Sequence, residues 1–251
     1  MKLVLADPKH FKDSITVISE LVNEARFKIT KEGVDLVAMD PANVAMVTFK
    51  LLSSAFTLYE LEKDTEICVN LSNLKQVLRR AKANDMLTLE LPEEGTLRIT
   101  LKSNSKRTFN IPLIDLEDRE QKVPNLTFPL SISTTSAILN DAIEDASIVA
   151  ESVSFVSDPE KFTIEGTGDL SKALIEIKAD NDQTKIKTDT TANVRSKYSI
   201  EYLKKMMNGA KLADTVDVYF SQDYPLKLEY KVIDRLQLSF ILAPRVETDR
   251  P

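Results

Sequence analysis

An internal repeat at an offset of 129 residues is the feature that most constrains how this chain can fold. The matching positions run without a gap from Leu74 to Lys102 in the first copy. They include Leu74-Lys75 with Leu203-Lys204, Ala81-Lys82 with Ala210-Lys211, Asp85 with Asp214, and Lys102 with Lys231. A weaker match at an offset of 128 links Phe27 with Phe155. A repeat of this length predicts two copies of one domain.

Each copy is predicted to contain two helices among many short strands. Apolar residues recur at helical spacing in four segments, which are residues 9–23, 72–83, 137–149 and 200–211. Ser72 is a suitable N-cap for the second of them. Apolar and polar residues alternate, as in strands, at 27–29, 47–51, 87–91 and 226–230. Because strands outnumber helices, we expect an α+β fold with largely antiparallel sheets.

Residues 116–129 separate the two copies. This segment, LEDREQKVPNLTFP, interrupts the periodicity with a charge run and two prolines, which is typical of a linker. The expected organisation is an N-terminal domain of residues 1–115, a connecting loop of residues 116–129 and a C-terminal domain of residues 130–251.

Composition limits the classes of protein that remain. A net charge of −6 argues against general affinity for nucleic acid unless the bases gather on one surface. The single cysteine, Cys68, cannot form an internal disulfide, which indicates an intracellular protein, and we expect it to be a small buried apolar residue. The N-terminal apolar run is too short for a signal peptide, and no segment is long enough to span a membrane. We expect a soluble intracellular protein.

Basic residues do gather on the predicted helices. Lys75, Arg79 and Lys82 share one stripe of the helix at 72–83, opposite its apolar face. In the second copy the matching helix carries Lys204, Lys205 and Lys211, and the first helix begins with Lys9 and Lys12. An ordinary solvated face would explain one such stripe, but two stripes at matching positions favour a surface that faces phosphate.

The helix at 137–149 is different, because it carries Asp141, Glu144 and Asp145 and no base. These acids would either repel DNA or pair with the bases of another subunit, for which Arg80, Lys82 and Arg107 are candidates. Two predicted strands suit sheet edges. They are residues 106–111, which end at Pro112, and residues 172–177.

Several segments resemble the proliferating cell nuclear antigen (PCNA) family of DNA sliding clamps. In their details they are most similar to the archaeal members of the family. They are LVAMDPANV at 36–44, VNL at 69–71, PLID at 112–115, YPL at 224–226 and LAPR at 242–245. The resemblance implies two similar domains per subunit and a pseudo-six-fold ring of three subunits, with helices lining a hole for duplex DNA. It also implies a processivity factor in DNA replication and repair, in the archaeal cytoplasm or nucleoid, or the nucleus of a eukaryote.

The resemblance further implies sites for partners. A clamp loader, DNA polymerase, flap nuclease and DNA ligase would insert short peptide motifs into a pocket under the connecting loop. Its residues would be Met39, Val44, Met46, Val123, Pro225, Ile241 and Pro244, although ordinary core packing also explains each. Gln121 and Ile241 depart from the family pattern and predict a different selectivity. Subunits would join through Phe109 and Ile111 of one strand and Leu174, Ile175 and Ile177 of the other.

Two other functions compete with a homotrimeric clamp. An enzyme is disfavoured, since one His and one Cys exclude the usual triads and zinc sites, and no glycine-rich phosphate loop is present. We expect no cofactor, no metal and no catalytic residue. A paralogous subunit of a hetero-trimeric or damage-signalling clamp is the remaining alternative.

Overall fold

The structure is a computed structural model that describes residues 1–92, 95–117, 121–180, 182–190 and 193–246. The chain divides into two compact units. Unit 1 consists of Met1–Asn43, Val47–Val123 and Lys231–Leu238, and unit 2 consists of Val44–Met46, Pro124–Tyr230 and Ser239–Pro251. Part of the predicted connecting loop, residues 118–120, lies outside the described residues.

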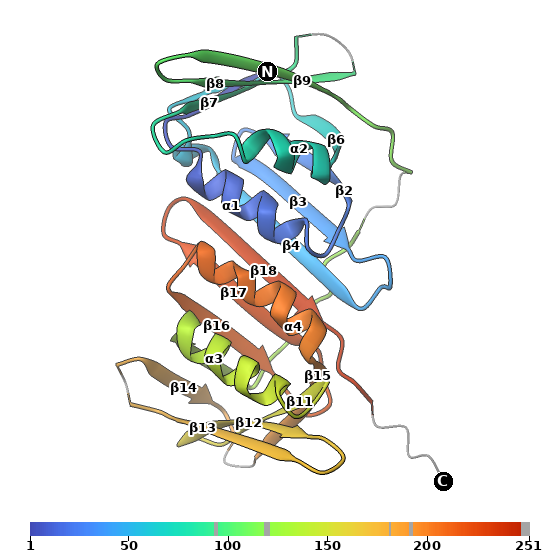
Figure 1. Ribbon diagram of the computed structural model, residues 1–251, viewed down its shortest axis with the longest axis vertical. Helices are drawn as coiled ribbons and strands as arrows, with labels where there is room; N and C mark the ends of the chain where they lie inside the picture. Colours follow the sequence, from blue (N-terminus) through green and yellow to red (C-terminus); the bar gives the residue numbers. More distant parts are fainter. Residues whose placement is uncertain (93–94, 118–120, 181, 191–192, 247–251) are drawn as a thin grey trace. The chain divides into compact units, whose positions relative to one another are not determined.

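Unit 1 contains two helices and two runs of antiparallel strands. One run has the order β5-β1-β7-β8-β9 and the other the order β4-β3-β2-β6. Figure 1 shows the two helices, α1 and α2, side by side in front of β2, β3 and β4. The elements are β1 (Lys2–Leu5), α1 (Lys9–Ile18), β2 (Glu24–Thr30), β3 (Gly33–Met39), β4 (Ala45–Leu52), η1 (Ser53–Ala55), β5 (Leu58–Glu60), β6 (Thr65–Asn70), α2 (Leu71–Leu78), β7 (Met86–Glu90), β8 (Thr96–Lys102) and β9 (Lys106–Pro112).

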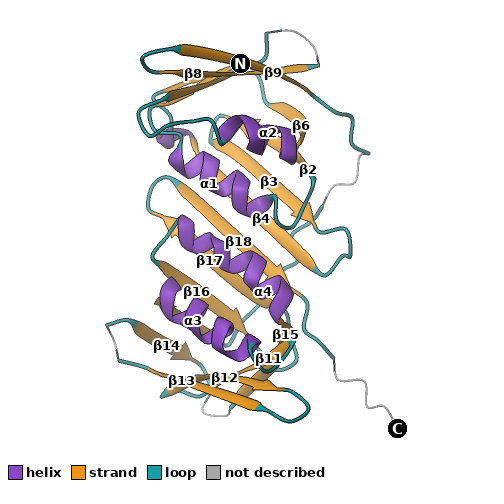
Figure 2. Ribbon diagram, viewed as in Figure 1, coloured by secondary structure: helices purple, strands orange, loops and turns teal. Residues whose placement is uncertain are grey.

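Unit 2 repeats this arrangement. Its strands have the orders β14-β10-β16-β17-β18 and β13-β12-β11-β15, and α3 and α4 lie side by side (Figure 2). The elements are β10 (Leu130–Thr135), α3 (Ser136–Ser147), β11 (Ser152–Ser157), β12 (Lys161–Thr167), β13 (Lys172–Lys178), β14 (Thr184–Thr188), β15 (Val194–Ser199), α4 (Ile200–Met207), η2 (Asn208–Lys211), β16 (Thr215–Phe220), β17 (Leu226–Val232) and β18 (Leu236–Leu242).

The predicted repeat is confirmed element by element. Counterparts α2 and α4 begin 129 positions apart, as do β6 and β15, and β7 and β16. The strand orders correspond as well, so β9 is the counterpart of β18, and β4 that of β13. The prediction of an α+β fold with antiparallel sheets and two helices in each copy is therefore confirmed.

The edge strands differ between the copies. In the strand order β4 and β18 are neighbours, whereas β9 and β13 each end a sheet, as the sequence predicted. At the β4–β18 pair, the Leu52 N–H donates to the Arg235 carbonyl at 2.8 Å, and the Ala243 N–H donates to the Val44 carbonyl at 3.0 Å. In the part of the chain that the structure describes, the backbone groups on the outer sides of β9 and β13 have no strand partner.

The core of each unit is built from both its sheets and its helices. In unit 1, Leu3, Phe11, Phe27, Leu74 and Leu89 line one small internal space, so both helices and strands of both sheets meet there. In unit 2 the core is aromatic: the ring of Phe155 lies 5.1 Å from that of Phe162, 5.3 Å from that of Tyr198 and 5.8 Å from that of Phe220. The absence of tryptophan is compensated by Leu, Ile, Phe and Tyr.

The helices are shorter than the sequence predicted, which moves some basic residues off them. Helix α2 begins after Asn70, whose side chain accepts the Asn73 N–H at 3.1 Å, so the prediction of Ser72 as N-cap is wrong. The helix ends at Leu78, because the Lys82 N–H donates to the Asp85 carboxylate at 2.7 Å instead of continuing the ladder. Lys82 therefore follows the helix, and Arg79 is its C-cap.

The other helices end early in the same way. Helix α1 stops at Ile18, α4 stops at Met207, and Lys211 lies at the end of the 3-10 turn η2. Among the described residues, no helix is long and apolar enough to cross a membrane.

Candidate functional site

The basic residues of unit 1 differ in how free their charges are. Lys75 pairs with Glu20 at 3.0 Å, Lys9 lies 3.3 Å from Asp13, and Lys12 donates to the Ala81 carbonyl at 3.2 Å. Arg79 and Lys82 are exposed and form no ion pair with any residue that the structure describes. Of the cations predicted to face DNA in unit 1, Arg79 and Lys82 are therefore the most available to an anion.

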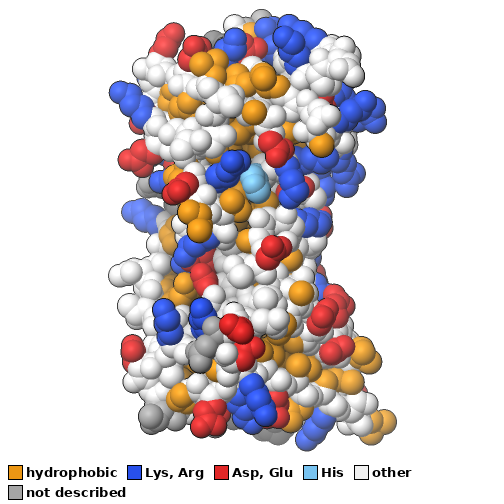
Figure 3. All heavy atoms as spheres, turned by 90° about the vertical axis from the view of Figure 1, so that its left-hand side faces the viewer, with side chains coloured by type: hydrophobic (Ala, Val, Ile, Leu, Met, Phe, Trp, Pro, Cys, Tyr) orange, Lys and Arg blue, Asp and Glu red, His pale blue; other side chains and the backbone are white. Residues whose placement is uncertain are grey.

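In unit 2 the matching lysines are also partly neutralised. Lys204 lies 2.7 Å from Glu144, and Lys205 lies 2.8 Å from Glu201 with its ammonium 5.1 Å from the centre of the Tyr202 ring. Lys211 is exposed. One face of the molecule accordingly shows blue and red side chains interspersed (Figure 3). Exposed pairs of this kind are weak, about 0.2–1 kcal/mol, so a phosphate can compete for the lysines.

The single histidine, His10, lies near the cations Lys9 and Arg235. Burial, followed by the charges of Lys9 and Arg235, lowers the pKa of His10 below its usual value. Figure 3 shows it, in pale blue, flanked by Lys and Arg side chains. His10 is therefore neutral near pH 7 and adds no charge to this surface.

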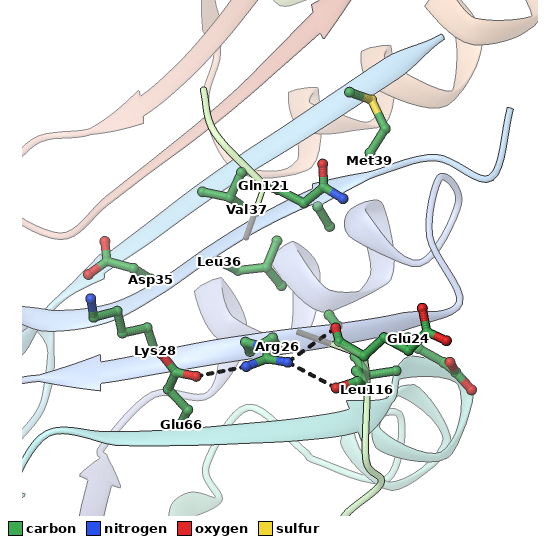
Figure 4. A pocket seen from close by; sticks show the side chains of 13 residues that line it. Glu24, Arg26, Lys28, Asp35, Leu36, Val37, Met39, Glu66, Leu116 and Gln121 are labelled. Atoms are coloured by element: carbon green, nitrogen blue, oxygen red, sulfur yellow. Dashed lines mark hydrogen bonds and ion pairs between the residues drawn. The ribbon is translucent and has the colours of Figure 1, made fainter. Parts of the chain in front are cut away.

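The start of the connecting loop is tied to the strands of unit 1. Arg26 on β2 donates to the Leu116 carbonyl at 3.1 Å and to the Glu117 carbonyl at 3.4 Å, and it pairs with Glu66 at 3.0 Å (Figure 4). The Ile114 N–H also donates to the Cys68 carbonyl at 3.0 Å. Beside these Arg26 contacts is a cavity of about 340 Å³, whose lining includes Ala25, Asp35, Val37, Met39 and Gln121.

Of the residues predicted for a partner pocket, Met39 lines this cavity and Val123 is 50% exposed. Val44, Pro225, Ile241 and Pro244 are partly exposed. Met46 is only 4% exposed, so a charge at this position would be buried and would disturb the fold. Ordinary packing accounts for Met46.

Sequence reasoning missed Arg26 and its partners, although the alternation in β2 places Glu24, Arg26 and Lys28 on one exposed face. It also assigned Cys68 to the interior. The Cys68 side chain is partly exposed, so that prediction is wrong. Its partial burial nevertheless raises the pKa of the Cys68 thiol.

A buried carboxylate organises the edge strand β9. Asp85 is 0% exposed and accepts the Lys82 N–H at 2.7 Å, the Ser103 hydroxyl at 2.7 Å and the Arg107 guanidinium. Arg107 also donates to the Arg80 carbonyl at 2.9 Å. Arg107 was predicted to face acids of a neighbouring subunit, but its guanidinium is already held inside unit 1. It therefore positions β9, and a role of Arg107 at a subunit interface stays a prediction.

The other predicted interface residues lie on exposed or edge positions. Asp141 and Asp145 are exposed on α3, and Arg80 is exposed after α2. On the edge strands, Phe109 and Ile175 are half-buried, and Leu174 is 64% exposed. Their neighbours Ile111 and Ile177 are buried, at 7% and 8% exposed. Within the described parts of the chain, no three His, Cys, Asp or Glu side chains are grouped as a metal site requires.

Comparison with known proteins identifies the relatives of this chain. The family model for the proliferating cell nuclear antigen N-terminal domain matches residues 2–121, and that for the C-terminal domain matches residues 122–245. A DNA polymerase sliding clamp of Thermococcus gammatolerans is 37% identical over 246 residues, 98% of each chain. One from Pyrococcus furiosus is 35% identical over the same shares.

Solved structures agree with these relatives. PCNA from Thermococcus kodakaraensis superposes with a TM-score of 0.91 at 28% identity, covering 97% of this chain and 99% of the other. The PCNA2-PCNA3 complex of Sulfolobus tokodaii gives a TM-score of 0.87 at 26% identity, covering 98% and 99%.

Replacing Asp85 by Asn should lower stability and flatten its dependence on acid. The Lys82 N–H, the Ser103 hydroxyl and then the Arg107 guanidinium lower the pKa of Asp85 to about 2. A carboxyl with a lowered pKa stabilises the fold above its unfolded pKa of about 4, and this contribution disappears as the pH falls through about 2.

Urea unfolding at pH 6, 4 and 2.5 measures this effect. Asp85→Asn should be less stable than wild type at pH 6 and should lose less stability between pH 4 and pH 2.5. The exposed Asp64→Asn is the control and should follow wild type. Equal acid dependence in Asp85→Asn and wild type would show that this carboxylate does not stabilise the fold.

Proposed function

Because the chain belongs to the proliferating cell nuclear antigen family, we propose that it is a DNA sliding clamp: a ring of three copies around duplex DNA that tethers DNA polymerase as a processivity factor. The observation that carries the proposal is the strand arrangement of the repeat. Residues 1–115 and 130–251 are the two clamp domains, and residues 116–129 are the connecting loop. Two domains in each of three chains give the ring its pseudo-six-fold symmetry.

The junction inside the chain supports the way in which the ring closes. β18 neighbours β4, and their counterparts β9 and β13 are edge strands. Pairing β9 of one copy with β13 of the next repeats the internal junction between chains, because each strand takes the place of its counterpart. Such a head-to-tail contact is heterologous, and it forms a closed ring when the rotation between subunits allows. Phe109 and Ile111 would meet Leu174, Ile175 and Ile177 there.

Charges flank this proposed strand pairing. Arg80 and Lys82, which follow α2, would face Asp141 and Asp145 of the next subunit. Arg107, whose guanidinium also pairs with Asp85 in its own chain, would lie beside them. One exposed ion pair contributes little, about 0.2–1 kcal/mol, so several are needed to influence assembly.

The DNA-facing residues would be Lys9, Lys12, Lys75, Arg79, Lys82, Lys204, Lys205 and Lys211. Their contacts would be with phosphates and would not read the base sequence. Internal pairing of Lys75 and Lys204 with glutamates keeps this attraction weak. Weak and sequence-independent contacts are what a ring that moves along DNA requires.

Partners would bind through short peptide motifs at the connecting loop. The clamp loader, DNA polymerase, flap nuclease and DNA ligase would share a pocket formed by Met39, Val44, Val123, Pro225, Ile241 and Pro244, with Met46 behind it. An apolar motif in a groove gains most from a few central anchors. The protein itself would catalyse no reaction and need no cofactor, and it would act inside an archaeal cell.

A hetero-trimer of paralogues is the second candidate. It is favoured by one observation: a PCNA2-PCNA3 complex is among the structures that resemble this chain. The homotrimer remains our proposal, because the proposed basic and acidic interface residues are present together in this one chain.

Reversing the acids on α3 should open the ring. Asp141→Lys with Asp145→Lys places bases opposite Arg80 and Lys82, and light scattering should then detect folded monomers. Adding Arg80→Glu and Lys82→Glu to the same chain should partly restore the trimer. The control Glu151→Lys with Asp182→Lys changes the net charge equally at exposed positions and should remain a trimer. A trimer that remains intact after the α3 reversal would show that these ion pairs do not hold the ring together.

Removing cations should weaken the hold on DNA without opening the ring. Arg79→Ala with Lys211→Ala should reduce polymerase processivity and lower the salt dependence of DNA binding, by a slope of about 0.9 for each phosphate that is no longer neutralised. The control Lys31→Ala with Lys63→Ala removes two exposed lysines outside the proposed set. Equal processivity in both double variants would refute this assignment of the DNA-facing residues.

A charge in the partner pocket should prevent peptide binding. Val123→Asp adds a carboxylate at a half-exposed position of the connecting loop, so the fold should tolerate it. Calorimetry with a peptide that carries an aromatic anchor on a helical turn should show binding at least about tenfold weaker, because a central anchor contributes ~2 kcal/mol. Val246→Asp, at an 81% exposed position, is the control. Unchanged binding to Val123→Asp would place the pocket elsewhere.

A further inference from the structure

The exposed face of the sheet β5-β1-β7-β8-β9 carries a hollow that the proposed function does not use. Its volume is about 470 Å³. The strands alternate, so Leu3, Leu89 and Ile99 point into the core, and the hollow lies on the opposite face. The residues that line it are Lys2, Val4, Thr57, Leu58, Met86, Thr88, Glu90, Thr100, Lys102 and Lys106.

Two lysines at one end of this face lie so close together that their positive charges repel each other unless an anion binds between them. Lys102 and Lys106 lie directly opposite each other in the β8–β9 ladder. Like charges in that position destabilise a sheet. Both side chains are exposed, and neither forms an ion pair with any residue in the described part of the chain.

Several other strand cations of this protein have an acidic partner. Lys50 lies 3.4 Å from Glu32, Arg195 lies 2.7 Å from Glu165, and Lys161 pairs with Glu176. Even on the same face, Lys2 lies 3.8 Å from Glu90. Lys102 and Lys106 are therefore two adjacent positive charges without an acidic partner among the residues that the structure describes, in a chain whose net charge is −6.

An apolar surface lies next to these charges. Met86 faces Lys102 across the β7–β8 ladder and is 43% exposed, and Leu58 on β5 is 37% exposed. Val4 lies between their strands, on β1. The flexible thioether of methionine adapts to different apolar groups. The face thus combines a shallow apolar hollow with a positively charged end.

In unit 2 the connecting loop packs on part of the counterpart of this face. Phe128 of the connecting loop lies 5.8 Å from Tyr219 of β16 and 5.8 Å from Tyr224. Tyr219 occupies the repeat position of Glu90, and the Lys227 ammonium lies 5.3 Å from its ring. The same face of the repeated sheet therefore accommodates a passing segment of chain in one copy and leaves the equivalent surface open in the other.

We propose that the face of β5-β1-β7-β8-β9 binds an extended acidic segment of a partner protein. Its carboxylates pair with Lys102 and Lys106, and one apolar side chain enters the hollow at Leu58 and Met86. A nucleic acid fits less well, because no described residue that lines the hollow is aromatic, and base stacking needs such a platform. This surface is separate from the connecting-loop pocket, so a partner can use both and gain affinity through the link.

Methionine-methyl NMR tests the proposal on the intact protein. The six methionines give a simple spectrum when their methyl groups carry ¹³C, and Met86→Leu assigns the Met86 signal. The probe is a hexapeptide of five glutamates and one leucine. It should shift the Met86 signal saturably and leave the Met39 signal in place, since Met39 lines the other cavity. A probe with lysines for glutamates should leave Met86 unchanged.

Two variants locate the binding surface. Lys102→Glu with Lys106→Glu should weaken binding at least about tenfold, because two attractions become repulsions. Lys31→Glu with Lys63→Glu changes the net charge equally and should bind as wild type does. Leu58→Asp, on the strand at the other edge of the sheet from β9, should also abolish the shift without involving the edge proposed for ring closure.

Three results would overturn the proposal. They are the absence of a saturable Met86 shift, equal affinity in the two double-lysine variants, and tighter binding of an oligothymidine than of the acidic hexapeptide at this face. The last result would assign the face to single-stranded nucleic acid. The Met86 signal and the Leu58→Asp variant report on strands other than β9, the edge proposed for ring closure, so a failure here is distinguishable from a failure of the proposed function.

Discussion

The hydrogen-bonding capacity of two edge strands is the constraint on which the rest of the account depends. A strand at a sheet edge presents unpaired N–H and C=O groups along its whole length. In this chain β4 and β18 are neighbours, whereas no described strand pairs with the outer sides of their counterparts β13 and β9. When two copies of one domain pair through one edge strand of each copy, one complementary edge strand remains unpaired in each copy. Joining those edges between copies completes every ladder.

The buried side chains around β9 are consistent with such a role. Asp85 and Arg107 hold this edge strand against the end of α2, so the strand is already in position before it meets another chain. A preorganised surface loses less conformational entropy when it associates. The same cluster ends α2 at Leu78 and sets where Arg79, Arg80 and Lys82 project. One buried carboxylate thus influences both the proposed subunit interface and the cations proposed to face DNA.

The repeat, the α+β fold and both edge strands were predictable from sequence, because each depends on periodicity or on proline. The ends of the helices were not, since they depend on a tertiary contact between Asp85 and the Lys82 N–H. The partners of Arg107 and Arg26 were missed for the same reason: an ion pair between residues far apart in the sequence leaves no local pattern. Burial was harder still to predict. Met46 lies on the face of β4 that also carries Thr48 and Lys50, and yet its side chain is buried.

Native mass spectrometry of the pure protein at micromolar concentration tests the central claim most directly. If β9 and β13 of different copies pair as β18 and β4 do, the edges are used up when the ring closes. The account predicts a single closed species of three chains, each of 28.2 kDa, with no larger forms as the concentration rises. A stable monomer, or a ladder of sizes that continues to grow with concentration, would contradict it.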